Sequence, residues 1–128
     1  MPIALIQPPQ FTPPAGHYSP AVVHRGLVYV SGQLPIDPAS GAHCRGPVED
    51  QAEQVMRNLA DILAAADSGL DRVLKVTVYV SDVSHWGAVN AVYARWMGSH
   101  RPARAIVPTG PLHHGFLLEL EAIAATRS

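Results

Sequence analysis

Charged side chains inside the two most apolar stretches of the C-terminal quarter constrain this chain more than any other feature. Residues 102–107 are apolar apart from Arg104 and predict a buried strand. Residues 116–124 predict a second strand, in which the two-residue period places Glu119 and Glu121 on one face. Because arginine is almost never fully buried without a partner, two arrangements are open. One is an ion pair that joins the strands, and the other is a pocket in which Arg104 binds a substrate carboxylate while a glutamate handles protons or water.

Length and composition predict one domain, residues 1–128, with enough chain to bury a continuous core. The hydrophobic share of 48% with 15% charged residues is typical of a globular protein. No apolar run approaches the roughly 20 residues of a membrane span, and the N-terminus lacks the pattern of a secretion signal, so we expect a cytoplasmic protein with no membrane partner. The one cysteine, Cys44, excludes an intrachain disulfide and any multi-cysteine metal centre.

The charge pattern argues against nucleic acid as a partner. Nine lysines and arginines are scattered along the chain, and the net charge is −1. The sequence also contains no phosphate-cradling glycine loop and no dinucleotide fingerprint, so it predicts no nucleotide cofactor.

The periodicity predicts an α+β fold. Five of the twelve prolines fall in residues 1–14, which should be extended and carry at most a short edge strand at 3–6. The remaining elements expected are a hairpin at 21–23 and 27–31, a loop at 35–47, a helix at about 48–66, a strand at 73–80, a second helix capped by Ser84, and the two C-terminal strands. Both helices are positioned to cover one face of the sheet.

Several polar side chains fall at positions that favour either structure or binding. Asn90 shares the apolar face of the second helix with Trp86 and Tyr93, so its amide is either a core hydrogen-bonding group or a ligand contact. Tyr18 and the Ser31–Gly32 turn have the same two interpretations.

The adjacent residues His113 and His114 should point to opposite sides of extended backbone, and no third ligand shares their spacing. We therefore interpret them as surface histidines and predict no metal site.

Taken together and in order, six segments resemble the signature segments of the Rid family, the reactive intermediate deaminases also called YjgF. The resemblance extends over nearly the whole chain from Tyr18 onward. The segments are residues 18–22, 30–35, 51–59, 89–93, 102–104 and 119–124.

This resemblance implies a chorismate-mutase-like subunit, with a mixed sheet backed by two helices, that assembles into a homotrimer with ligand sites between subunits. It also implies hydrolysis of enamine and imine intermediates, such as 2-aminoacrylate and 2-imino acids, to 2-keto acids and ammonia without a cofactor. The family's carboxylate-binding arginine falls on Arg104 and its water-handling glutamate on Glu119. Its other site positions fall on Tyr18, Ser31, Gly32, Asn90 and the backbone of Ile106.

Several departures from the family pattern border the expected pocket. Ala105 and Ile106 stand where a serine and a cysteine are typical, which removes any thiol role. His17 and the pair His113 and His114 stand in segments where proline is common, and this leaves the substrate open. Three alternatives therefore remain: a non-catalytic protein that binds or senses small carboxylates, a pathway-specific deaminase of a larger enamine, and an RNA-cleaving translation inhibitor, against which the lack of a basic patch argues.

Overall fold

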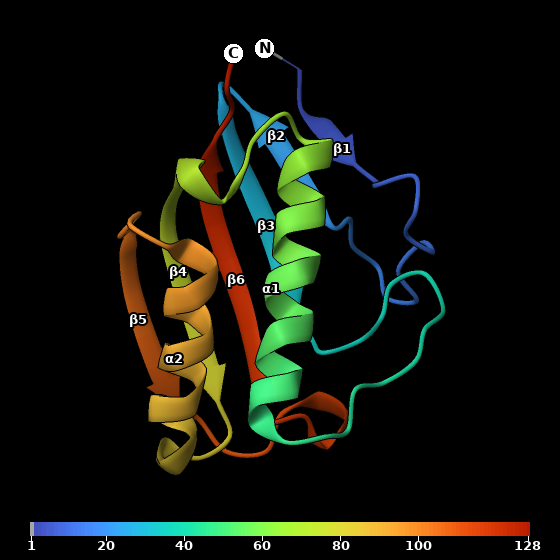
Figure 1. Ribbon diagram of the computed structural model, residues 1–128. Helices are drawn as coiled ribbons and strands as arrows, with labels where there is room; N and C mark the ends of the chain where they lie inside the picture. The colour runs from blue at the N-terminus through green and yellow to red at the C-terminus, as the bar shows by residue number, and fades with distance from the viewer. Residues whose placement is uncertain (1) are drawn as a thin grey trace.

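Alternating apolar residues build a six-stranded mixed sheet in the computed structural model, which describes residues 2–128 (Figure 1). The strand order is β1-β2-β3-β6-β4-β5, in which β4 and β5 are parallel and every other pair is antiparallel. The strands are β1 (Ala4–Ile6), β2 (Ala21–His24), β3 (Leu27–Gln33), β4 (Val73–Val80), β5 (Ala103–Pro108) and β6 (Leu118–Ala125). The predicted α+β class and order of elements are confirmed.

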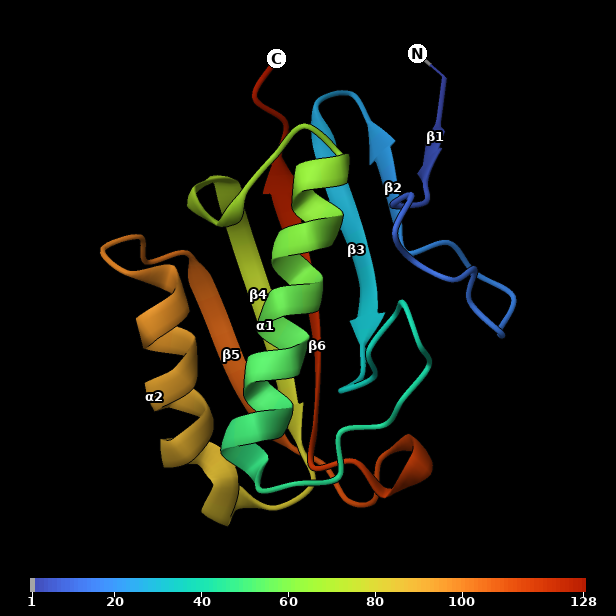
Figure 2. The same ribbon diagram turned by 45° about the vertical axis from the view of Figure 1, so that its right-hand side comes forward.

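Helices α1 (Val48–Ala65) and α2 (Trp86–Met97) lie on the same face of this sheet, as Figures 1 and 2 show from two sides. Helix α1 begins at the predicted residue and ends one residue early. No helix among residues 2–128 combines the length and apolar character that a membrane crossing requires.

The core lies between the helices and the sheet. In β6 the residues Leu118, Leu120, Ala122 and Ala124 are buried against the helices, whereas Glu119 and Glu121 project from the opposite, open face. Burial of each large aliphatic side chain contributes about 1.5–3 kcal/mol, so this alternation fixes which face of β6 points inward.

The β2–β3 hairpin ends in an irregularity that positions part of the site. Val28 and Val30 are buried while Tyr29 is exposed, as the period of two predicts. Between Val30 and Gln33 the pairing of β3 with β6 shifts register. Such a bulge re-aims the strand locally, and here it contains Ser31 and Gly32.

The prediction that residues 102–107 form a buried strand is wrong about burial. Strand β5 is the edge of the sheet, and Ala103, Ala105 and Val107 are exposed. Arg104 and Ile106 are half-buried and face α2. An apolar strand pattern indicates that other residues pack against the strand. It does not indicate whether those residues belong to the same protomer.

The prediction of Ser84 as a helix cap is also wrong. Ser84 lies within a short 3₁₀ helix, Val83–His85, and α2 begins only at Trp86. Asp82 caps this 3₁₀ helix: its carboxylate accepts a hydrogen bond from the backbone N–H of Ser84 at 2.8 Å, which lowers the pKa of Asp82. The N-cap of α2 itself is His85, which makes no capping bond through its side chain.

Candidate active site

Arg104 is held on the helix-covered side of the β5 edge. Its Nη1 donates to Oδ1 of Asn90 at 2.7 Å, and its Cζ lies 4.9 Å from the ring centroid of Tyr93 and 5.5 Å from that of Trp86. The aromatic faces attract the cation while Asn90 orients it. Among residues 2–128 no carboxylate lies within ion-pair distance of Arg104, so the structural ion pair does not form in this chain.

A hollow of about 450 Å³ opens beside this arginine, between α2 and the start of β5. Tyr93 is 7% exposed, and its hydroxyl is the one buried side-chain polar atom in residues 2–128 without a hydrogen-bond partner. Burial also raises the pKa of Tyr93, which keeps the hydroxyl a neutral donor. A guanidinium and an unused hydroxyl suit a small anion. The lining includes Asn90, Tyr93, Met97, His100, Arg101 and Arg104.

Glu119 projects from the opposite face of the sheet, where its carboxylate lies against the backbone of Gly32. A Cβ at position 32 would overlap that carboxylate, which gives the bulge a steric requirement for glycine. Burial raises the pKa of Glu119, and repulsion from Glu121 raises it further, while His113 acts in the opposite direction. A carboxylate with a raised pKa is a better proton acceptor near neutral pH.

Ser31 ties the bulge to the segment that precedes β2. Its hydroxyl donates to the carbonyl of Ser19 at 2.6 Å, and its N–H donates to the carbonyl of Pro20 at 3.0 Å. The neighbouring Tyr18 is 55% exposed, so its ring is available to a ligand or to another chain.

The predicted residues therefore form two separate groups, which we call the arginine side (Arg104, Asn90, Ile106) and the glutamate side (Glu119, Gly32, Ser31, Tyr18). Arg104 pairs through β4 with Ala122, three residues along β6 from Glu119. That separation is about 10 Å along the strands and about 10 Å across them, and the two side chains leave opposite faces. One protomer cannot bring both groups to the same small molecule.

Ile106 belongs to the arginine side through its backbone. Its side chain packs toward the core, whereas β5 has a paired strand on one side only. An edge strand leaves part of its N–H and C=O groups unpaired, and these groups can bind a ligand whatever the side chain is.

The histidine geometry differs from the prediction. His113 and His114 lie in a 3₁₀ turn rather than in extended backbone, with His114 at a φ of 61°, and their ring centroids are 3.7 Å apart. Both are exposed, as expected of surface histidines. Residues 2–128 contain no group of three or more histidine, cysteine or acidic side chains that could hold a metal ion.

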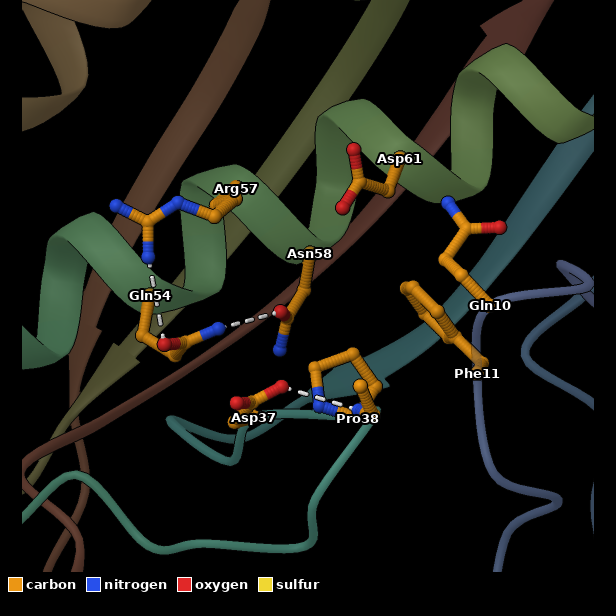
Figure 3. Close-up of a pocket in the computed structure, with 9 residues that line it drawn as sticks. Gln10, Phe11, Asp37, Pro38, Gln54, Arg57, Asn58 and Asp61 are labelled. Carbon is orange, nitrogen blue, oxygen red and sulfur yellow. Dashed lines mark hydrogen bonds between the residues drawn. The ribbon is translucent and has the colours of Figure 1, made fainter.

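A smaller hollow of about 150 Å³ lies between the N-terminal segment and α1 (Figure 3). Two of its polar side chains already have partners: Gln54 donates to Asn58 at 2.8 Å, and Asp37 accepts from the backbone N–H of Ala39 at 3.0 Å. None of the predicted site residues lines it, so we do not assign the site there.

Gln51 is a supporting residue that the sequence reasoning missed. It is 3% exposed on α1, donates to the carbonyl of Gly46 at 2.9 Å and accepts from the N–H of Leu117 at 2.9 Å. These bonds fix the loop after β3 to the segment that enters β6. The signal was present, because Gln51 is four residues before Val55 and thus on the buried face of the helix.

Comparison with known proteins supplies the family. The chain belongs to the Rid (YjgF) family, whose model, described as endoribonuclease L-PSP, matches residues 10–126. A 2-iminobutanoate/2-iminopropanoate deaminase from Rattus norvegicus is 40% identical over 109 residues, which cover 85% of this chain and 80% of that protein. The predicted resemblance is thereby confirmed.

Solved structures confirm the predicted fold class. The crystal structure of YEO7 from yeast aligns with a TM-score of 0.93 at 36% identity and covers 98% of this chain and 100% of that one. TdcF from E. coli, solved with bound serine, aligns with a TM-score of 0.89 at 30% identity and covers 98% of this chain and 99% of that one.

Proposed function

We propose that this protein hydrolyses 2-imino acids and their enamine tautomers, such as 2-aminoacrylate, to 2-keto acids and ammonia. The observation that carries the proposal is Glu119, a half-buried carboxylate with a raised pKa, held over a glycine bulge where water can reach it. The name of the rat relative, a 2-iminobutanoate/2-iminopropanoate deaminase, supports the same chemistry.

The separation of the two sides leads us to propose a homotrimer in which the arginine side of one protomer faces the glutamate side of the next. The open face of the sheet supports this assembly. Tyr29, Leu5 and Val107 are 45%, 70% and 38% exposed on that face, and a neighbouring protomer would remove these apolar side chains from water.

In this arrangement Arg104 binds the carboxylate of the imino acid through two parallel N–H donors. Asn90 and the two aromatic rings hold the guanidinium in place before substrate arrives, which reduces the ordering cost of binding. Backbone groups at Ile106 and Gly32 would contact the remaining polar atoms of the substrate.

Glu119 then acts twice on the same proton. As a carboxylate it takes a proton from water while the oxygen adds to the carbon of the protonated imine (C=NH2+), and the C=N electron pair moves to nitrogen to give a neutral carbinolamine. Protonated Glu119 then gives that proton to the amino nitrogen, the C–N bond breaks and ammonia departs. The hydroxyl proton passes to solvent as the C=O bond of the keto acid forms. Carbon keeps its oxidation level throughout, so the sequence of steps consumes only water.

The test generates 2-aminoacrylate from serine with a dehydratase and follows pyruvate formation while a nucleophilic trap competes. We expect Glu119→Gln to lower the rate by about 10²-fold or more with ligand affinity retained, because the substitution keeps the hydrogen-bonding shape but removes the base. Arg104→Lys should weaken keto-acid binding measured by calorimetry, because lysine lacks the planar two-point grip.

Glu49→Gln and Arg72→Lys, at exposed positions outside the site, are the matched controls. Full activity in folded Glu119→Gln would contradict the assignment. Pyruvate binding by the wild type without turnover of any imine would favour a binding protein, and cleavage of RNA would favour the activity in the family model's description.

A further inference from the structure

Two loops bring together a group of basic side chains that the mechanism above does not use. Arg45 donates through Nη2 toward Nδ1 of His43 at 3.0 Å and through Nη1 to the carbonyl of His114. The ring centroids of His43 and His114 are 4.8 Å apart, and those of His114 and His113 are 3.7 Å apart. We call these four residues the histidine–arginine cluster.

No side chain of the cluster forms an ion pair within residues 2–128. The two ion pairs in residues 2–128 lie elsewhere, at Arg95 with Glu53 and at Arg127 with Asp71. Burial lowers the pKa of His114, and the neighbouring His113, His43 and Arg45 lower it further. Arg45 uses two of its five N–H groups on the contacts above and remains exposed.

The cluster lies at the same end of the sheet as the glutamate side. The loop from residue 34 to 47 continues from the β3 bulge, and the turn at His113 leads into β6, whose second residue is Glu119. The charge of His113 acts to lower the pKa of Glu119, against the larger effects of burial and Glu121. Figures 1 and 2 both show the loop and the turn close together beside the N-terminal end of α1.

Both loops are held before any ligand binds. Gln51 bonds the backbone at Gly46 and at Leu117, and the guanidinium of Arg45 lies 4.8 Å from the ring centroid of Phe116. A planar guanidinium fixed on an aromatic face, with unused donors, is suited to bind a carboxylate.

We propose that the histidine–arginine cluster binds a second carboxylate, at the distal end of the substrate, so that the protein prefers dicarboxylic 2-imino acids to 2-iminopropanoate. The inference rests on the proposed function, because Arg104 of a neighbouring protomer would hold the first carboxylate. It names the class of substrate, a 2-imino acid with an acidic side chain.

Kinetic measurements with two imines test the preference. An amino-acid oxidase generates 2-iminopropanoate from alanine or 2-iminoglutarate from glutamate, and keto-acid release is followed against a competing trap. We expect a higher kcat/KM for 2-iminoglutarate, and we expect Arg45→Gln to lower that value about tenfold through KM, since a charge-assisted hydrogen bond is lost. Turnover of 2-iminopropanoate by Arg45→Gln should change little. Arg45→Lys should retain more of the kcat/KM for 2-iminoglutarate than Arg45→Gln does.

Arg57→Gln, which removes an exposed arginine from α1 outside both sides of the site, is the control for net charge. Equal kcat/KM for the two imines, or equal loss on both in Arg45→Gln, would overturn the inference. Calorimetry with 2-oxoglutarate and pyruvate separates this outcome from failure of the proposed function. A preference for 2-oxoglutarate that depends on Arg45 supports the distal site even if neither imine is hydrolysed.

Discussion

At the scale of single residues, Gly32 and Glu119 form the contact on which the chemistry depends. The carboxylate of Glu119 occupies the space that any side chain at position 32 would need. A methyl group there would displace the carboxylate from the position where it meets water. Catalytic geometry of this kind tolerates displacements of only about 1 Å.

We therefore expect Gly32→Ala to lower the rate of imine hydrolysis by at least about tenfold while the protein stays folded. Gly87→Ala is the matched control, because no atom outside its own stretch of helix backbone and its chain neighbours lies within 4 Å of the new methyl group. Circular dichroism and the imine assay on both variants give the comparison. Equal activity of the two variants would show that the reaction does not require glycine at position 32.

Glu119 also has a measurable effect on stability. Burial raises its pKa in the folded protein above its ordinary value of 4.5, so the folded state holds its proton more tightly than the unfolded state does. The charged form consequently destabilises the fold at high pH, and the penalty disappears as the pH falls below 4.5.

Glu119→Gln should therefore raise Tm near neutral pH and leave Tm nearly unchanged at about pH 4, where the wild-type side chain is protonated in both states. Thermal melts across this pH range measure the difference. A Tm gain that does not depend on pH would mean that the charge of Glu119 is not the cause.

The sequence predicted more of the contacts on the arginine side than on the glutamate side. Asn90 and Tyr93 share a face with Trp86 by helical period, and the structure places all three around Arg104. The opposite faces of Arg104 and Glu119 were not visible in the separate strands, because the face of each depends on which strand pairs with which.

At the scale of elements, the sequence predicted the strands and helices well and the position of one strand poorly. Strand β4 matches its prediction at both ends because Val76, Val78 and Val80 repeat at a period of two. Strand β5 is just as apolar but lies at an edge, and only pairing with β4 decides that. The 3₁₀ turn before α2 was missed because its capping group is the carboxylate of Asp82 and not the hydroxyl of Ser84.

Gln51 joins two elements that the sequence shows only as loops. We expect Gln51→Leu to lower the free energy of unfolding by about 1–3 kcal/mol, because the substitution removes the side-chain partner of the part-buried N–H of Leu117 and of the carbonyl of Gly46. Denaturant titration measures the change, with the exposed Gln10→Leu as control. A loss no larger than that of the control would show that neither bond contributes.

At the scale of the whole molecule, the fold leaves one face of the sheet uncovered by its own helices and leaves the edge strands β1 and β5 each paired on one side only (Figures 1 and 2). A hollow of about 330 Å³ lies on that face, lined by residues that include Tyr29, Lys75, Glu121 and Ile123. The same surface carries apolar and charged groups, as association surfaces do. We expect light scattering to give about three times 13.7 kDa.

In the homotrimer we propose, each site takes Arg104 from one protomer and Glu119 from its neighbour. Co-expression of Arg104→Met and Glu119→Gln chains with different tags, followed by purification on both tags, yields only mixed trimers. In a closed ring of three, each mixed trimer contains one interface with both groups intact.

We therefore predict about one third of the wild-type rate of imine hydrolysis in the mixed trimers, although each variant alone is nearly inactive. Activity of the mixed trimers no higher than that of the separate variants would contradict a site shared between protomers.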